Sequence, residues 1–226
     1  MPPDGLGERY RCIVGELHRQ PDEEVHLRYL VGTPDFEKAQ GHGFWGHPAF
    51  KVNRESHTRG VMQAFMLRLP PSSRKDYAAY LEGFCIPREA DLSDFALLGY
   101  TGARLPSDGF GLVHPFDDVD GPCEFLTDVA GVRHCLEADE AQGLPLNALV
   151  RLQAEPKNLH DSGAVTVFCN GKKLGYIKRG LTDAFRRWVE REDVTATIER
   201  LNGNLKRPMV LLFIRVLPTR IPAAMA

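Results

Sequence analysis

The 226-residue sequence has no long apolar run, no paired-cysteine motif and no motif of a known catalytic site. Because a membrane helix needs about 18 or more consecutive apolar residues, we expect no membrane partner. The first ten residues lack the basic and apolar segments of a secretory signal. The five cysteines are scattered without C-x-x-C spacing. This pattern predicts free thiols in a reducing cytoplasm.

Catalytic patterns are also missing: there is no G-x-S-x-G, phosphate loop, H-E-x-x-H or helicase box. His160 adjoins Asp161, and His134 adjoins Cys135. Neighbouring residues rarely supply a nucleophile and its base, which converge from separate strands. We therefore predict a protein that is not an enzyme, with no catalytic residues, no cofactor and no metal.

One glycine motif and three histidines raise the question of a dinucleotide site or a zinc site. Residues 41–46 read G-x-G-x-x-G, but Pro48 and an irregular stretch follow where a dinucleotide site needs a helix, so we reject that function. His42, His47 and His57 lack the helical spacing or thiolate neighbours of a strong zinc site. We interpret them as loop histidines and keep zinc binding as a minor alternative.

Charge differs between the two halves of the chain. Residues 1–124 carry 13 Lys/Arg against 19 Asp/Glu, a balance of −6, whereas residues 125–226 carry 15 against 11, a balance of +4. Residues 171–187 contain six basic side chains and one acid. This predicts two units with different partners and a local positive face that can bind phosphate. An ordinary solvated surface is the competing interpretation.

The clearest structural signal lies in residues 147–180. Two apolar runs of β type flank Asn170-Gly171, a strong hairpin signal because both residues tolerate a positive φ. An earlier polar turn contains Pro156 and Asp161. We predict three short antiparallel strands here.

The same segment resembles the HIRAN module, found in DNA-remodelling helicases and as stand-alone bacterial domains. The resemblance covers roughly residues 124–217, and residues 130–134 resemble that family's first strand. The matching residues are Glu155, Pro156, Asn158, Asp161, Ala164, Val165, Gly175, Tyr176 and Arg179.

The HIRAN resemblance implies binding to the 3′ end of single-stranded DNA. Arg133 would neutralise a phosphate, and Asp161 would accept a hydrogen bond from the 3′-hydroxyl. Tyr176 and Arg179 would hold base and backbone. A carboxylate repels phosphate but accepts a hydroxyl, which favours an end over an internal nucleotide.

This chain departs from the family at three positions. His134 and Cys135 stand where the DNA-gripping member has two aromatics, and His160 stands where tyrosine is common. Histidine stacks on a base but cysteine does not, so the base platform is weakened. The structural alternative is that Asn158 and Asp161 satisfy their own turn and that Tyr176 is half-buried packing.

The first half predicts a hairpin over residues 9–31, a loop-rich stretch over 32–59 and a helix over 60–69. A helix from Tyr77 toward Gly83 follows, with Ser73 and Asp76 as a capping box. A third helix begins at Asp91 and ends at Gly99 as its cap.

This half resembles the small N-terminal subdomain of HipA-type kinases, without the kinase body. The resemblance implies a protein-contact role and no activity. The matching residues are Phe65, Leu69, Pro70, Arg74, Phe95, Leu97, Leu98 and Gly102.

The second half predicts a strand over 125–130, a helix over 181–191 capped by Thr182 or Gly180, and strands over 194–201 and 209–216. Asn202-Gly203-Asn204 reads as a turn. We predict an α+β protein: a hairpin-plus-helices unit (1–113), a linker (114–123), a small OB-like β-barrel with one helix (124–217) and a tail (218–226).

Two functions follow from different classes. The first is non-enzymatic, HIRAN-type binding of single-stranded DNA, with Arg133, His134, His160, Asp161, Tyr176 and Arg179 as the binding residues. The second is a protein-interaction module related to HipA-type toxin–antitoxin systems, in which the first half has a protein partner.

Overall fold

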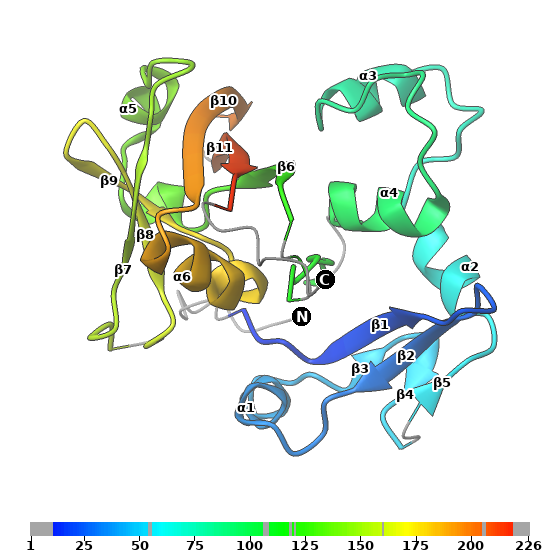
Figure 1. The fold of residues 1–226 in the computed structure, drawn as a ribbon. Coiled ribbons are helices and arrows are strands. Elements are labelled where there is room, and N and C mark those ends of the chain that lie inside the picture. The colour runs from blue at the N-terminus through cyan, green and yellow to red at the C-terminus, as the bar shows by residue number, and fades with distance from the viewer. Residues whose placement is uncertain are drawn as a thin grey trace, which may run out of the picture. The chain divides into compact units, whose positions relative to one another are not determined.

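The computed structural model describes residues 11–53, 56–105, 109–117, 119, 121–159, 161–204 and 207–218. The chain divides into two compact units (Figure 1). The first comprises residues 1–74 and 92–111, and the second comprises residues 75–91 and 112–226. We describe each unit by itself.

The first unit is built on the predicted hairpin. Strands β1 (Gly15–Arg19) and β2 (Val25–Tyr29) pair in antiparallel fashion, and β5 (Ser56–His57) adds to β2. Strands β3 (Gly46–His47) and β4 (Phe50–Lys51) form a separate two-stranded sheet. Helix α2 (Val61–Met66) confirms the helix predicted over 60–69.

The stretch predicted as loop-rich contains a helix, α1 (Pro34–Gly41), so that prediction was wrong. The Thr33 side chain caps the helix by accepting from Phe36 N at 3.3 Å, and Pro34 occupies the first turn, where proline is favoured. The helix buries one large side chain, Phe36, and therefore lacks the apolar periodicity that reveals longer helices.

Helix α4 (Asp94–Thr101) corrects the boundaries predicted for the third helix. Ser93, not Asp91, caps its start by accepting from Ala96 N at 3.2 Å. Gly102, not Gly99, ends it, because Gly102 takes the left-handed conformation with φ 70°.

An aromatic cluster forms the core of the first unit. His47 stacks on both Phe50 and Phe65, with ring centroids 5.2 and 5.1 Å away, and the two phenylalanines stack on each other at 6.4 Å. The Tyr29 hydroxyl donates to Phe50 O and accepts from His47 N, each at 2.8 Å. These contacts give His47 a packing role.

The second unit contains two three-stranded antiparallel sheets. One has the order β10-β11-β6, from β6 (Cys123–Asp128), β10 (Val194–Asn204) and β11 (Arg207–Val216). The other has the order β7-β8-β9, from β7 (Arg151–Ala154), β8 (Val165–Cys169) and β9 (Lys172–Tyr176).

The strand predictions were close, but the predicted OB-like barrel is not confirmed. Within the described residues, isolated bridges link the two sheets, Ala130 to Tyr176 and Leu149 to Thr197, instead of a continuous ladder. Residues 202–204, predicted as a turn, extend β10, because Asn202 pairs with Met209 and Asn204 with Arg207.

More than one helix accompanies these sheets, which corrects the prediction of a single helix. Helix α6 (Thr182–Glu190) packs against β7, β8 and β10, and α5 (Ala138–Gln142) packs against β10 and β11 (Figure 1). Leu181 is the N-cap residue of α6, without a side-chain cap, so neither Thr182 nor Gly180 is its cap. A short 3₁₀ helix, η2 (Arg179–Leu181), leads directly into α6. The N-cap residue Leu181 is therefore already helical in its backbone.

Helix α3 (Tyr77–Glu82) also belongs to the second unit. Asp76 is its N-cap residue and makes no side-chain cap hydrogen bond, so the capping box predicted from Ser73 was wrong. Arg200 Nη1 on β10 donates to Glu82 O at the end of α3 at 2.8 Å.

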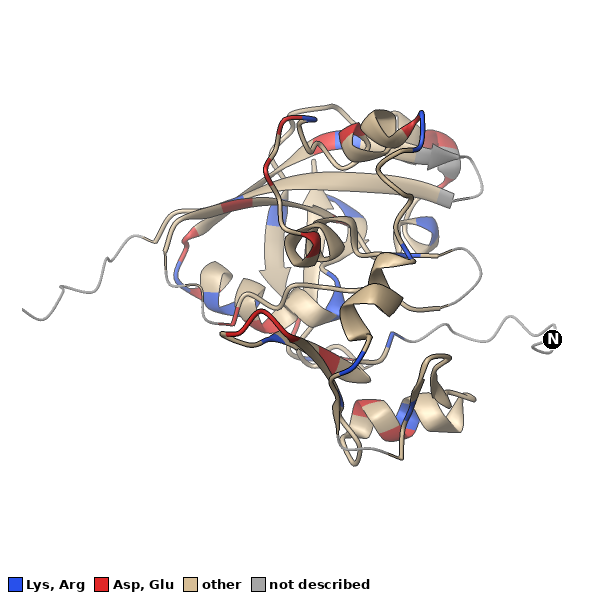
Figure 2. Ribbon diagram, turned by 90° about the vertical axis from the view of Figure 1, so that its right-hand side faces the viewer, with Lys and Arg blue, Asp and Glu red and all other residues tan. Residues whose placement is uncertain are grey.

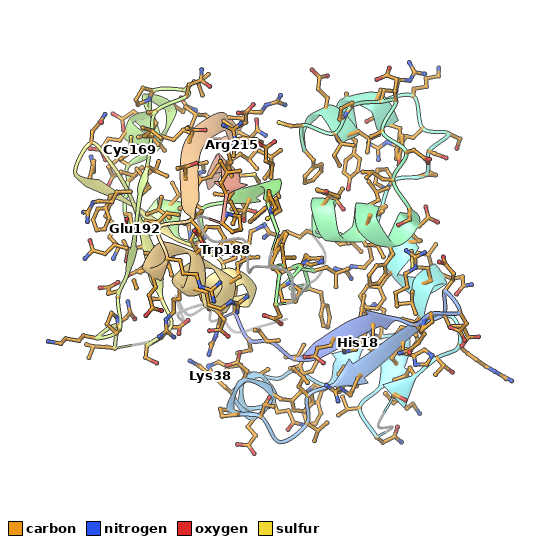
Figure 3. The ribbon with its side chains drawn as sticks, viewed as in Figure 1. His18, Lys38, Cys169, Trp188, Glu192 and Arg215 are labelled. Atoms are coloured by element: carbon orange, nitrogen blue, oxygen red, sulfur yellow. The ribbon has the colours of Figure 1, made fainter. Side chains whose placement is uncertain are left out.

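The core of the second unit lies between the sheets and α6. Val165, Val167 and Leu174 are fully buried, as are Phe185 and Ile198. Trp188, labelled in Figure 3, is 3% exposed and packs edge-on against Phe185.

Candidate nucleic-acid interface

The turn between β7 and β8 is held by its own polar side chains. Asn158 Oδ1 accepts from Asp161 N at 3.1 Å, and Asp161 Oδ1 accepts from Gly163 N at 2.9 Å. Glu155 Oε2 accepts from Asn158 Nδ2 at 3.1 Å and from Thr166 Oγ1 at 2.9 Å. Side chains of the turn therefore satisfy two of its own backbone N–H groups, those of Asp161 and Gly163, as the structural alternative predicts.

The hydrogen bonds from Asn158 and Thr166 lower the pKa of Glu155, and the nearby charge of Lys173 acts in the same direction. Both donors stabilise the carboxylate form of Glu155. Glu155 therefore anchors the turn as an anion at neutral pH.

Tyr176 connects this turn to β9. Its hydroxyl accepts from Asn158 Nδ2 at 3.3 Å and from Lys173 Nζ at 2.6 Å. Lys173 Nζ also lies 4.1 Å from the centroid of the Tyr176 ring. The two halves of the sequence motif, residues 155–161 and 173–179, thus meet through one cluster of hydrogen bonds.

The pKa of Lys173 is raised. Burial alone would lower it, but the hydrogen bond to Tyr176 and the attraction of Tyr176, Glu155 and Cys135 outweigh the burial. Lys173 is therefore a cation at neutral pH, held above an aromatic ring on β9.

Asp161 and Arg179 lie side by side at the end of the motif. Arg179 Nε is 3.8 Å from Asp161 Oδ2, with 34% and 29% of the two side chains exposed. This distance marks an ion pair and is longer than a hydrogen bond. Asp161 therefore presents a partly exposed oxygen next to a cation.

Arg133 and His134 belong to η1 (Val132–His134), a 3₁₀ helix, so the match of residues 130–134 to a strand was wrong beyond Ala130. Gly131 turns the chain there with φ 78° and lies beside the Tyr176 ring. Arg133 Nε donates to His134 Nε2 at 3.1 Å, and both side chains are exposed. His160 lies outside the described residues.

Most basic side chains of residues 171–187 are already engaged. Lys172 pairs with Glu140, and Lys178 pairs with Asp128 with only 14% and 15% of the side chains exposed. Arg187 donates to Phe116 O at 3.0 Å. In Figure 2, basic and acidic positions occur together along the chain. The positive face expected from this stretch is thus smaller than the sequence count implies.

Lys173 is the site residue that sequence reasoning missed. In a regular strand, residues three apart point to opposite faces, so Lys173 and Tyr176 would not meet. A β-bulge shifts the register between Val167 and Phe168, and both side chains then lie on one face. Gly175, an isolated glycine inside β9, is the sequence feature that signals such a bulge.

Comparisons with known proteins support the second half of the sequence interpretation. Residues 123–212 match the family model of the HIRAN domain. Among solved structures, the HIRAN domain of human HLTF is 20% identical, with 42% of this chain and 78% of that chain covered and a TM-score of 0.35. A Lactobacillus plantarum protein is 20% identical, with 42% and 97% covered and a TM-score of 0.36.

The search of curated proteins finds no match to this chain. The family match confirms the HIRAN resemblance for residues 123–212. The HipA resemblance of the first half receives no support from these comparisons.

Two further findings concern membranes and metals. Of the helices in the described ranges, none combines the length and hydropathy that crossing a membrane requires. Within those same ranges, no three His, Cys, Asp or Glu side chains are grouped so as to hold a metal ion.

Proposed function

We propose that the HIRAN domain at residues 123–212 binds single-stranded nucleic acid and holds its 3′ end beside Asp161. The observation that carries this proposal is the placement of Asp161 next to Arg179, 3.8 Å apart, in a segment that matches a HIRAN domain. A nucleic-acid-binding role is what the family match supports, and recognition of the end is the finer proposal.

The chemistry favours an end over an internal nucleotide. Asp161 Oδ2 accepts a hydrogen bond from a terminal hydroxyl, whereas it repels a phosphate at the same place. Arg179 attracts the phosphate of the terminal nucleotide, and exposed Arg133 takes a second phosphate. Lys173 adds a positive charge over the Tyr176 ring, and His134 and His160 are proposed to line the same site.

Fluorescence anisotropy of short labelled single strands tests this proposal. We expect tighter binding of a strand with a free 3′-hydroxyl than of one with a 3′-phosphate, and affinity should fall as salt rises. Asp161→Asn keeps the acceptor for Gly163 N but removes the charge, so it should reduce the preference for the free hydroxyl. Equal binding of both strands by the unaltered chain would contradict end recognition.

The phosphate contacts have their own test. On single strands, each phosphate contact contributes about 0.7 to the slope of log affinity against log salt. Replacing Arg133 and Arg179 together by alanine should lower that slope by about 1.4. Arg191→Ala is the matched control, because Arg191 is exposed at the far end of α6 from Arg179. If the double variant has the same slope as the control, Arg133 and Arg179 do not contact phosphates.

A protein partner for the first unit is the second candidate function. Trp45 and Leu67 are each 84% exposed, and large exposed apolar side chains are enriched at protein contacts. Trp45→Ser with Leu67→Ser should abolish recovery of a bound protein in pull-downs without changing strand binding. Recovery of the same partner by the double variant would exclude a role for these two side chains.

A further inference from the structure

The outer face of sheet β7-β8-β9 carries two pairs of a cation and an aromatic ring. Arg151 on β7 pairs with Phe168 on β8, and its guanidinium carbon lies 4.5 Å from the ring centroid. Lys173 lies over Tyr176 on β9 at 4.1 Å. The alternate side chains Val165 and Val167 are fully buried, so the opposite face of the sheet is the core face.

The Arg151 side chain is positioned by two neighbouring side chains although it is exposed. Its guanidinium rests on Phe168 and donates to Gln153 Oε1. Nucleobases stack on guanidinium planes as they do on aromatic rings. An arginine that is already oriented by a ring loses less conformational entropy when it forms such a stack.

Lys173 belongs to the second pair, but its backbone lies beside the first. Its backbone pairs with Phe168 on β8, whereas its ammonium reaches the hydroxyl and ring of Tyr176. Thr166 is the β8 partner of Tyr176. Phe168 follows Thr166 by two residues on β8. Because an antiparallel strand rises about 3.4 Å per residue, Phe168 lies about 7 Å along the strand from the position opposite Tyr176.

We propose that Arg151 and Phe168 form a second nucleotide position next to the strand end held at Asp161. The base stacks on the Arg151 guanidinium, which Phe168 supports from below. Lys173 binds the phosphate that joins this nucleotide to the terminal one. This inference rests on the proposed function, because the first position is the strand end.

The pairing of a planar cation with a separate ammonium favours nucleic acid over an acidic peptide. A nucleotide offers a flat base and one phosphate, which match Arg151 and Lys173 respectively. An acidic peptide offers carboxylates without a planar ring system, so the Arg151–Phe168 stack would contribute only its charge.

The test compares how the full chain binds labelled thymidine strands of one and two nucleotides at one low salt concentration, because only the longer strand reaches the second position. The unaltered chain should bind the longer strand more tightly, because a base beyond the end is stacked. Arg151→Gln should weaken binding of the longer strand by about fivefold or more, the effect of one lost base stack. Arg215→Gln is the matched control, because Arg215 also lies over a ring, Phe213, at 5.7 Å on the other sheet (labelled in Figure 3).

A second measurement needs no substitution. A photoreactive iodouridine placed one nucleotide from the 3′ end should cross-link to the β8 peptide containing Phe168 in the unaltered chain. Cross-linking confined to other peptides would overturn the proposal. The proposal would also be overturned if the Arg151→Gln chain kept the preference for the longer strand. In that case the site for the strand end at Asp161 would be unaffected.

Failure of the proposed function gives a different result, because the unaltered chain would then bind neither strand. If a hexaglutamate peptide bound instead, and Arg151→Gln abolished that binding, the face would belong to an acidic peptide and the nucleotide position would be overturned.

Discussion

At the residue scale, Gly175 holds the strand that carries Tyr176 against residues 129–131. Its φ is 147°, and a Cβ at this position would lie 2.3 Å from Ala130 O and 2.8 Å from Val129 Cγ1. Those contacts are too short for any side chain, so only glycine allows the bridge between Ala130 and Tyr176.

We predict that Gly175→Ala lowers the free energy of unfolding by about 3 kcal/mol, through backbone strain and the clash with Ala130. Urea unfolding monitored by circular dichroism measures this change. Gly171→Ala is the control: it also has a positive φ, 80°, but no atom lies within 4 Å of the methyl group that alanine would add, so it should cost about 1 kcal/mol. Equal losses in the two variants would show that the clash does not matter.

Glu155 gives a pH-dependent prediction. Its pKa is lowered in the folded chain by the hydrogen bonds from Asn158 and Thr166, so its carboxylate stabilises the fold at pH above about 4.3, the ordinary value. That stabilisation is lost as the pH falls through the lowered pKa. Glu155→Gln should therefore cost about 1 kcal/mol at pH 7 and progressively less as the pH falls through the lowered pKa, measured by urea unfolding across pH.

The matched control for this prediction is Glu190→Gln, an exposed carboxylate on α6. A difference between Glu155→Gln and the unaltered chain that does not shrink as the pH falls through the lowered pKa would mean that the ionised carboxylate is not what holds the turn.

At the scale of elements, the segment before β6 packs on the rest of the second unit through Phe116. Phe116 stacks on Phe125 of β6 with centroids 4.2 Å apart and meets Trp188 of α6 edge-on at 5.9 Å. Arg187 Nη2 donates to Phe116 O at 3.0 Å. Phe116 therefore joins β6 and α6 from outside the main sheets.

We predict that Phe116→Ala lowers the free energy of unfolding of the second unit by about 2 kcal/mol, because the substitution removes a half-buried ring from an aromatic cluster. The change should also alter the fluorescence of Trp188. Asp117→Ala, an exposed neighbour, should leave both unchanged. Unaltered stability in Phe116→Ala would mean that this segment contributes no packing.

The elements also show where local sequence signals suffice. Apolar periodicity and Asn170-Gly171 correctly predicted α2, α6 and the hairpin of β8 and β9. Helices α1 and α5 were missed, because a helix of five to eight residues that buries little has no measurable periodicity. The Thr33 cap followed by Pro34 was the available signal for α1.

At the scale of the whole molecule, the two units offer separate spectroscopic reporters. The chain has two tryptophans, and Trp45 lies in the first unit whereas Trp188 lies in the second. Trp45 is 84% exposed and Trp188 is 3% exposed. Unfolding should therefore shift Trp188 emission strongly to the red and Trp45 emission little.

A ligand that binds the second unit should raise the unfolding temperature reported by Trp188. At a hundred times the dissociation constant, the added stability is about 2.7 kcal/mol. We predict that a single strand with a free 3′-hydroxyl shifts the transition of a Trp45→Phe chain. A Trp188 transition that stays unchanged at saturating strand would contradict binding to the second unit.

The sequence by itself determined most of the strands, the HIRAN resemblance and the motif residues Glu155, Asn158, Asp161, Tyr176 and Arg179. These depend on local patterns and on fixed spacing, which the chain carries in its order of residues. Only the tertiary structure decided which charges are engaged, because ion pairs such as Lys178 with Asp128 join residues far apart in the chain. It also decided that Lys173 meets Tyr176, because a β-bulge reverses the face that strand alternation assigns.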